Sequence, residues 1–311
     1  MKPKSTQTKN IKLPVTTSSF EDALAKGKFA ITCEFGPPKG VGTEEIRSKA
    51  KILKGLVDGV NVSDLQSSLM SLGSIATCHL LKDIGLEPIL QITCRDRNRL
   101  ALQSDLLSAY VLGIKNVLVL TGDYPTMGDH PQAKPVFDLD SVQLLWAIKR
   151  LEEGYDIAGN ELTTNPTFFK GAALNPNADT DVVIELQLIK MKKKIDQGAQ
   201  FFQTQPIFDA RLFEKFMERV SKININVPII AGIMLLKSEK MANYINKFIP
   251  GIHIPEPLIN KIVETEDKVS MSLEIATSII NKIKPICAGI HIGIQGWEEH
   301  IPALLKKVDI D

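Results

Sequence analysis

The feature that most constrains the fold of this chain is an alternation of short apolar runs with longer segments of helical periodicity. The apolar runs are rich in β-branched residues and predict strands at Phe29–Phe35, Gly59–Ser63, Pro88–Thr93, Asn116–Leu120, Phe168–Ala173, Phe201–Gln205, Val227–Ile233 and Gly289–Ile294. The amphipathic segments between them predict helices at Glu44–Leu56, Ser67–Ile84, Asn98–Leu112, Asp140–Glu153, Asp181–Gln197, Ala210–Ile223, Ser238–Phe248 and Lys268–Ile283. Such an alternation indicates a parallel sheet with helical crossovers.

The number of these units favours a closed barrel over an open sheet. Several predicted strands are apolar almost throughout, as expected for a parallel sheet that is covered on both faces. About eight strand–helix units close a barrel, which commonly takes about 250 residues. The alternative, a doubly wound open sheet, usually has a Gly-rich first turn, and no GxGxxG sequence follows the first predicted strand. We therefore expect an α/β fold, a parallel (β/α)8 TIM barrel, over residues 19–311, after a flexible tail at residues 1–18.

The charges of the chain balance, and this excludes a global attraction to polyanions. Lys and Arg total 37 against 36 Asp and Glu, which leaves a formal net charge of +1. The four cysteines form no CxxC pair and the histidines have no partner at metal-ligand spacing, so we expect a metal-free site. The N-terminal stretch lacks the apolar core of a secretion signal, and no segment reaches the roughly 20 apolar residues of a membrane span. We expect a cytoplasmic protein that binds neither nucleic acid nor membrane.

Polar residues end one predicted strand after another, and this pattern locates a candidate site. In barrels of this kind the active site is built at the carboxyl ends of the strands. Polar side chains that gather there are suited to a polar ligand. The residues at these positions are Glu34, Ser63, Asp64, Thr93, Arg95, Asp96, Thr121, Asp123, Asn175, Gln203, Thr204, Gln205 and Gln295.

Glu34 carries the most specific chemical expectation of this set. It stands between Cys33 and Phe35, and the chain turns directly afterwards at Gly36-Pro37-Pro38. A carboxyl group in a largely apolar barrel mouth has a raised pKa and can act as a general acid near neutral pH. The competing interpretation is a carboxylate held in a structural salt bridge near a loop.

Two further features allow both a structural and a functional interpretation. Asp123 follows Gly122, which lets the backbone approach a flat ligand closely, but an Asp before Pro125 is also a common turn former. The lysine-rich stretch at residues 190–194 is typical of a solvated helix face, although a cationic helix end could also hold a cofactor phosphate. The long Gly- and Pro-rich segment Tyr124–Asp138 predicts a binding loop or lid. The segment Tyr155–Thr167 lies on the opposite face and predicts a structural embellishment.

Five motifs in order along the chain resemble the methylenetetrahydrofolate reductase family over nearly its whole length, from about Phe29 to about Trp297. They are Cys33–Pro38 (CEFGPP), Gln91–Asp96 (QITCRD), Leu120–Asp123 (LTGD), Lys194–Ala199 (KIDQGA) and Thr204–Asp209 (TQPIFD). No one motif is diagnostic, but five in the correct order on a predicted barrel are specific.

The resemblance implies a reaction and a role for each matching residue. It implies the flavin-dependent reduction of 5,10-methylenetetrahydrofolate to 5-methyltetrahydrofolate, a step of one-carbon metabolism that leads to methionine. Glu34 is then the acid, Asp123 stabilises the developing cation and tunes the flavin, and Gln205 with Thr204 binds the pterin. The residues that match flavin-lining positions are Ser63, Gln91, Thr93, Thr121, Gly122, Asp123, Asn175, Lys193 and Lys194.

Departures from the family pattern gather on the outer half of the expected site. Thr121 stands where enterobacterial members carry arginine, and Gln91 where they carry histidine. Leu174 stands about where a tyrosine contacts flavin, and the nicotinamide-stacking phenylalanine has no counterpart near Ser238–Lys240. Gly293–Trp297 replaces a polar end that contains arginine. The resemblance implies FAD, with FMN as the alternative because the adenine-side contacts match least.

The chain is similar to the short reductases of anaerobic one-carbon pathways, which raises the hypotheses of an oligomer and of a second subunit that supplies electrons. Two alternatives of different classes stay open. One is a non-catalytic barrel subunit that docks a redox partner, and the other is a flavin-dependent amine dehydrogenase of the proline-oxidising type. A flavin-free hydride transfer from nicotinamide to folate is a third.

Overall fold

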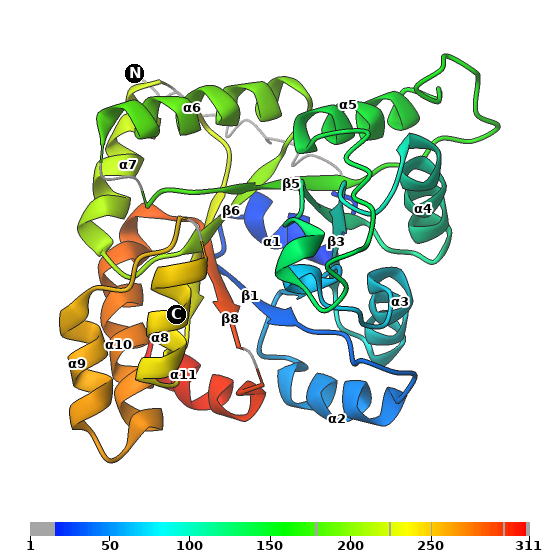
Figure 1. The fold of residues 1–311 in the computed structure, drawn as a ribbon. Helices are drawn as coiled ribbons and strands as arrows, with labels where there is room; N and C mark the ends of the chain where they lie inside the picture. The colour runs from blue at the N-terminus through cyan, green and yellow to red at the C-terminus, as the bar shows by residue number, and fades with distance from the viewer. Residues whose placement is uncertain (1–15, 178–179, 224, 250, 295, 309–311) are drawn as a thin grey trace, which may run out of the picture.

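Eight parallel strands form a closed barrel in which each strand pairs with the next and β8 pairs with β1, so the predicted (β/α)8 fold is confirmed (Figure 1). The computed structural model describes residues 16–177, 180–223, 225–249, 251–294 and 296–308. The strands are β1 (Ala30–Phe35), β2 (Gly59–Val62), β3 (Pro88–Thr93), β4 (Asn116–Leu120), β5 (Phe169–Leu174), β6 (Phe201–Pro206), β7 (Ile229–Met234) and β8 (Gly289–Gly293). Each begins and ends within two residues of its predicted bounds.

Helices surround the strands (Figure 1). The α-helices are α1 (Ser19–Ala25), α2 (Thr43–Leu53), α3 (Ser74–Ile84), α4 (Arg99–Val111), α5 (Ser141–Glu152), α6 (Asp181–Asp196), α7 (Ala210–Lys222), α8 (Glu239–Phe248), α9 (Glu256–Glu264), α10 (Lys268–Ile283) and α11 (Ile301–Lys307). Short 3-10 turns are η1 (Gln66–Ser68), η2 (Pro125–Met127), η3 (Lys284–Ile286) and η4 (Glu298–His300). Capping side chains explain several helix starts, such as the reciprocal hydrogen bonds between Asp140 and Gln143 at α5.

The structure corrects the helix predicted at Ser67–Ile84, which begins only at Ser74. Ser67 and Ser68 have left-handed backbone angles, with φ of 52° and 60°, so a right-handed helix cannot pass through them. Helices α1, α9 and α11 were not predicted, because short segments give too few turns for their periodicity to be recognised.

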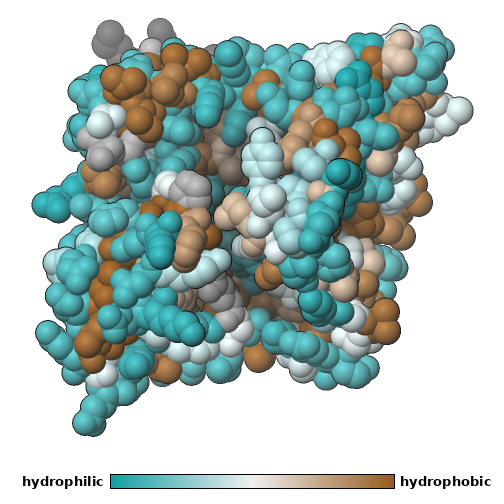
Figure 2. All heavy atoms as spheres, viewed as in Figure 1, coloured by the Kyte–Doolittle hydropathy of each residue, from teal (hydrophilic) through white to brown (hydrophobic). Residues whose placement is uncertain are grey.

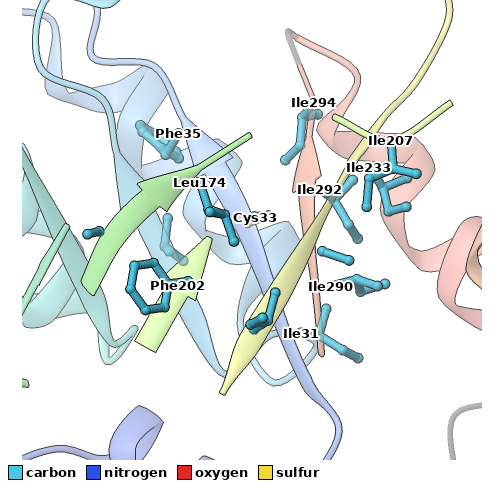
Figure 3. Close-up of a cluster of buried hydrophobic side chains, with 14 of the residues drawn as sticks. Ile31, Cys33, Phe35, Leu174, Phe202, Ile207, Ile233, Ile290, Ile292 and Ile294 are labelled. Carbon is cyan, nitrogen blue, oxygen red and sulfur yellow. The ribbon is translucent and has the colours of Figure 1, made fainter. Parts of the chain in front are cut away.

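The main hydrophobic core lies between the strands and the helices. Alternate residues of each strand point outward into it, as Ile31, Cys33 and Phe35 do on β1 (Figure 3). The residues between them therefore point into the barrel. This alternation sends Glu34 to the interior side of β1.

Helix α1 closes the amino-terminal end of the barrel and is seen within the ring of strands (Figure 1). Phe20 is buried against Phe169 and Phe201, which begin β5 and β6, with ring centroids 5.7 and 5.4 Å away. Ala30, Leu118 and Ile230 complete this apolar layer, among others. The barrel therefore opens to ligands at the carboxyl ends of its strands. Residues 1–15 of the predicted tail lie outside the described residues, so the domain boundary stays a prediction.

The loop after β4 and the segment before β5 are both held in place by contacts within the protein. In the loop after β4, Asp129 forms an ion pair with Lys39 at 2.6 Å and Asp138 forms one with Arg99 at 2.8 Å. The segment before β5 closes on itself through an antiparallel bridge between Tyr155 and Glu161. The face seen in Figure 2 is largely hydrophilic, with apolar side chains exposed over α6, where Leu186 is 52% exposed.

Candidate active site

The predicted site residues lie at or just beyond the carboxyl ends of six neighbouring strands. Glu34 is the penultimate residue of β1, Ser63 follows β2, and Gln91 and Thr93 lie on β3. Thr121, Gly122 and Asp123 follow β4, Asn175 follows β5, and Thr204 and Gln205 lie on β6. Because all strands run parallel, these ends meet at one mouth of the barrel. Lys193 and Lys194 come from the last turn of α6. Gln295 lies outside the described residues.

Glu34 is half-buried at the mouth, and its surroundings favour the neutral acid. Its Oε1 accepts a hydrogen bond from Gln66 Nε2 at 3.1 Å. Burial raises the pKa of Glu34 above its ordinary value of 4.5, and the hydrogen bond from Gln66 opposes that rise only in part. The raised pKa agrees with the expectation from sequence, and the role of Glu34 as a general acid stays a prediction.

The segment that carries Gln66 has an unusual backbone. Leu65, Ser67 and Ser68 all lie in the left-handed region, with φ of 50°, 52° and 60°. Such angles cost free energy in residues with a Cβ atom and persist only where the surrounding structure enforces them. This turn brings Gln66 to Glu34, and sequence periodicity could not reveal it because the predicted helix includes Ser67 and Ser68.

The side chain that enforces this turn is Arg95, whose guanidinium is buried beneath it. Arg95 donates to the Leu65 carbonyl at 3.2 Å, to Ser68 Oγ at 2.9 Å and to the Asp123 carbonyl at 3.4 Å. Asp96 neutralises the charge at 2.7 Å. Arg95 was predicted only as a strand-end residue, and the structure gives it a function in holding three loops together.

Asp123 lies across this turn from Glu34. Its backbone carbonyl also accepts a hydrogen bond from Ser68 Oγ at 3.2 Å, while its carboxylate is exposed and bonds to no other described residue. The preceding Gly122 has φ of 95°, and a Cβ atom there would come within 3.0 Å of Arg95 Cβ and 3.2 Å of Thr93 Cβ. Glycine is therefore required for the chain to turn so close to β3.

The two β6 residues divide their tasks. The Thr204 hydroxyl accepts from the Gly232 N–H at 2.8 Å and donates to the Gln205 carbonyl at 2.8 Å, which fixes a register shift between β6 and β7. Thr204 is buried, and Gln205 is exposed at the mouth. Gln205 thus presents an amide that bonds to no other described side chain, and Thr204 holds its backbone from behind.

Ser63 and Thr93 are buried and already donate within the protein. Ser63 Oγ donates to the Phe35 carbonyl at 3.3 Å. Thr93 donates its backbone N–H and its hydroxyl to Asp64, each at 2.9 Å, and Arg97 neutralises that carboxylate at 2.7 Å. Both hydroxyl oxygens can still accept a hydrogen bond from a ligand. Gln91 is buried beside Thr93, and Asn175 Oδ1 caps its own turn by accepting from the Asn177 N–H.

A cavity of about 280 Å³ opens beside the end of β4. Its walls come from the loop after β4 and from the first turn of α5, and its lining residues are Thr121, Gly122, Tyr124, Phe137, Leu139, Asp140 and Gln143. The Tyr124 and Phe137 rings lie 5.3 Å apart in this wall. A larger cavity of about 890 Å³ lies in the outer layer between α7, α9 and α10, and none of the predicted site residues lines it. We place the site at the mouth, where the polar groups converge.

Lys194 brings a half-buried positive charge near this smaller cavity. Its Nζ donates to the Ala173 carbonyl at 2.7 Å. Burial lowers the pKa of Lys194 to about 8, with a further decrease from Lys190 and an opposing increase from Asp140, which lines the cavity. Within the described part of the chain no carboxylate pairs with this ammonium, so an anionic ligand would find a cation there. Lys193, its neighbour, is exposed.

Neither a metal centre nor a membrane segment is found in the described residues. They contain no cluster of three or more His, Cys, Asp or Glu side chains that could hold a metal ion. Over the same residues, every helix is too short or too polar to cross a bilayer.

Comparison with known proteins identifies the family. Residues 19–308 match the family described as methylenetetrahydrofolate reductase. The chain belongs to this family. A probable methylenetetrahydrofolate reductase (NADPH) of Caenorhabditis elegans is 29% identical over 66% of the chain and 28% of the relative. Methylenetetrahydrofolate reductase 1 of Schizosaccharomyces pombe is 24% identical over 92% of the chain and 47% of the relative.

The chain therefore spans less than half of these two methylenetetrahydrofolate reductases. A bacterial relative, the 5,10-methylenetetrahydrofolate reductase of Pectobacterium carotovorum, is 26% identical over 74% of the chain and 73% of the relative. A solved structure of an uncharacterized Clostridium thermocellum protein, described as binding two copies of 5-methyl-5,6,7,8-tetrahydrofolic acid, has a TM-score of 0.66 at 19% identity. The similarity covers 94% of this chain and 99% of the Clostridium thermocellum chain, and the two proteins share a fold.

Proposed function

We propose that this protein reduces 5,10-methylenetetrahydrofolate to 5-methyltetrahydrofolate with a bound flavin. The observation that carries the proposal is the family match over residues 19–308, because it includes every predicted site residue. The position of Glu34 supports it, since the reaction needs an acid and the barrel mouth offers a half-buried carboxyl group with a raised pKa.

The residues at the mouth fit a flavin. The cavity of about 280 Å³ has the aromatic walls and the close glycine that a flat ring system needs. Lys194 provides a half-buried ammonium without a carboxylate partner among the described residues, which suits a cofactor phosphate. The residues that would hold the flavin are Ser63, Gln91, Thr93, Thr121, Gly122, Asp123, Asn175, Lys193 and Lys194. When bound, a flavin supplies two-electron hydride chemistry.

In this proposal Glu34 delivers the proton that opens the substrate ring. The methylene carbon bridges two nitrogens and accepts hydride poorly until one carbon–nitrogen bond breaks. The proton passes from the Glu34 carboxyl to the leaving nitrogen, which keeps the bonding electron pair, and an iminium cation remains. Addition of hydride to the cationic carbon then gives the methyl product, so that charge and electrons balance. The Gln66 amide stabilises the carboxylate left on Glu34.

Asp123 and Gln205 act on the substrate from either side of the mouth. The exposed Asp123 carboxylate places a negative charge near the developing cation and so lowers the energy of the transition state. The Gln205 amide has both a donor and an acceptor, which complement the hydrogen-bonding edge of a pterin. Thr204 contributes by fixing the backbone of Gln205.

The cofactor, the electron donor and the assembly state are also proposals. We propose FAD, as the family resemblance implies, and mass spectrometry of the released flavin would distinguish FAD from FMN. We propose an oligomer that receives electrons from a second subunit, as in the short reductases that the sequence resembles. Sedimentation velocity measures the oligomer. NADH oxidation by the purified chain with folate, at an enzyme-like rate, would remove the need for a second subunit.

A spectroscopic titration tests the proposed function. The purified protein should be yellow, lose its flavin absorbance on anaerobic reduction and recover it when methylenetetrahydrofolate is added. Free 5-methyltetrahydrofolate should appear in equal amount to the flavin reoxidised. A protein that binds no flavin, or that stays bleached with folate present, would contradict the proposal. If the flavin absorbance recovers with the imine of a secondary amine instead of folate, the amine dehydrogenase is favoured. If the flavin bleaches but no substrate turns over, the redox-docking subunit is favoured.

A further inference from the structure

The interior of the barrel beneath Glu34 contains a polar contact between opposite strands. Asn61 on β2 donates from Nδ2 to Gln203 Oε1 on β6 at 2.6 Å. In a closed barrel of eight strands, β2 and β6 face each other, so this hydrogen bond crosses the interior. Asn61 is 0% and Gln203 8% exposed. Both side chains therefore point inward and meet in a layer that excludes most solvent.

This contact leaves one buried polar atom without a partner. Asn61 Oδ1 is buried and accepts no hydrogen bond from the described residues. An amide oxygen in this position loses its hydration on folding and gains nothing in return. Buried polar atoms are almost always satisfied in native proteins. The orphaned oxygen therefore indicates a donor that is present in one state of the site.

The neighbouring residue that can supply this donor is Glu34. Asn61 is the register partner of Glu34 on the adjacent parallel strand, so the two side chains lie on the same face of the sheet. Neighbouring strands are about 4.8 Å apart, which is within reach of two side chains of this length. Glu34 Oε1 is occupied by Gln66, and the second carboxyl oxygen carries the proton when the acid is neutral.

We propose that Asn61 is a positioning residue for Glu34: its Oδ1 accepts the O–H of the neutral carboxyl and holds the acid protonated and oriented at the barrel mouth. Gln203 fixes the Asn61 amide so that the oxygen faces Glu34. The inference rests on the proposed function, in which Glu34 is the acid. Once Glu34 gives up its proton, the Asn61 amide oxygen does not stabilise the Glu34 carboxylate. Reprotonation of Glu34 is therefore favoured before the next turnover.

Other titratable groups around Glu34 do not offer the same hydrogen bond. On β8, burial lowers the pKa of His291 to about 3, and its Nδ1 lies 3.1 Å from Thr32 Oγ1. At the end of β2, Asp64 is engaged by Thr93 and Arg97. On the outer side of β1, burial raises the pKa of the Cys33 thiol, with smaller contributions from Glu298 and Glu34.

The test measures the protonation of Glu34 in the flavin-free protein by infrared spectroscopy. The carbonyl stretch of the neutral Glu34 carboxyl is identified as the band that disappears in Glu34→Gln, and it is titrated with pH. In Asn61→Ala the pKa of Glu34 should fall by about one unit, because the neutral form loses its acceptor. The band should also move to higher wavenumber. Asn61→Ser, whose hydroxyl is too short to reach, should give the same result if the alanine variant does not fold.

Gln203→Ala is the matched control, because it opens the same interior without removing the acceptor. Its Glu34 pKa should fall by less than half as much. An unchanged pKa in both Asn61 variants would overturn the inference, and so would a raised pKa, which would mean that the amide N–H faces the carboxyl. If the pKa falls as expected while Glu34→Gln still reduces folate, the positioning role stands and only the proposed function fails.

In the active enzyme the same shift should appear in the pH profile. The alkaline limb of folate reduction should move to lower pH in Asn61→Ala by the shift measured in the infrared titration. At acidic pH, where Glu34 is protonated in both proteins, the rates should converge. A general loss of rate at every pH would indicate a merely structural role and would contradict the proposal.

Discussion

At the scale of single residues, the two carboxyl groups of the site differ because their surroundings differ. Glu34 ends a strand, points into the barrel and is half-buried, so its neutral form is favoured. Asp123 stands beyond its strand in an exposed turn and keeps its carboxylate free of other described residues. Two carboxyl groups with environments this different can serve one reaction as proton donor and as charge stabiliser.

Replacing Glu34 separates activity from stability. Glu34→Gln should retain flavin and lose folate reduction by about 100-fold or more, since general acids contribute at least that much. The folded state binds the Glu34 proton more tightly than the unfolded chain, so its stabilising effect is present below pH 4.5 and is lost as pH rises through the raised pKa. The variant should therefore gain stability relative to the wild type between pH 5 and pH 8 in urea unfolding. A constant difference across that range would contradict this account.

Replacing Asp123 tests its electrostatic role. Asp123→Asn removes a negative charge beside the proposed flavin site, so the midpoint potential of the bound flavin should rise. Folate reduction should slow by about tenfold or more, whereas reduction of the flavin by its donor should not slow. Spectroelectrochemistry measures the potential. An unchanged midpoint potential together with slowed turnover would show that the charge of Asp123 does not tune the flavin.

Lys194 should make flavin affinity dependent on pH. Its pKa is lowered to about 8, so the ammonium that would pair with a phosphate is present below that pH and is lost above it. Flavin binding should weaken from pH 7 to pH 9 in the wild type, and in Lys194→Arg it should not. Lys192→Ala is the control, because that lysine is exposed on the same helix. Fluorescence quenching of free flavin measures the affinity.

Sequence reasoning could locate Glu34, Asp123 and Gln205 because the end of a barrel strand is a position that apolar periodicity reveals. It could not reveal that Gln66 bonds to Glu34, because that contact depends on a left-handed turn. Nor could it pair Asn61 with Gln203, since residues 142 apart meet only once the barrel has closed.

At the scale of elements, the loops after β2, β3 and β4 form one unit around Arg95. The strand bounds followed from sequence because each strand is a continuous apolar run, as Pro88–Thr93 and Asn116–Leu120 show. The start of α3 did not, because local helical preference in Ser67–Ser68 is overridden by hydrogen bonds from a distant arginine. Tertiary contact decided the conformation at the point where the site is built.

Replacing Arg95 should loosen this unit. Arg95→Met leaves Asp96 without its partner and removes the hydrogen bonds to Ser68 and to two loop carbonyls, so we expect a loss of about 2–4 kcal/mol in unfolding free energy. The KM for folate should rise, because Gln66 loses its orientation toward Glu34. Arg99→Met, which breaks the exposed pair with Asp138, is the control and should change stability little. Equal losses in both variants would argue against a special role for the buried guanidinium.

At the scale of the whole molecule, stability and site lie at opposite ends of the barrel. Phe20→Ala should cost about 3–5 kcal/mol, because it empties the space against the stacked rings of Phe169 and Phe201. The site is formed at the far ends of the strands, so turnover per folded molecule should stay within about twofold of the wild type well below the melting temperature. Thermal unfolding and active-site titration with flavin measure the two effects separately. A variant that loses turnover in proportion to stability would show that the two ends are coupled.

The aromatic layer around Phe20 also limits how the proton of Glu34 can exchange with solvent. Because the amino-terminal end is sealed, the proton on Glu34 can reach bulk water only through the mouth. A ligand that covers the mouth leaves the substrate as the group to which this proton can be transferred. Deuterium placed on the Glu34 carboxyl before the ligand binds should therefore be transferred to the substrate in the first turnover. It should not exchange with solvent first.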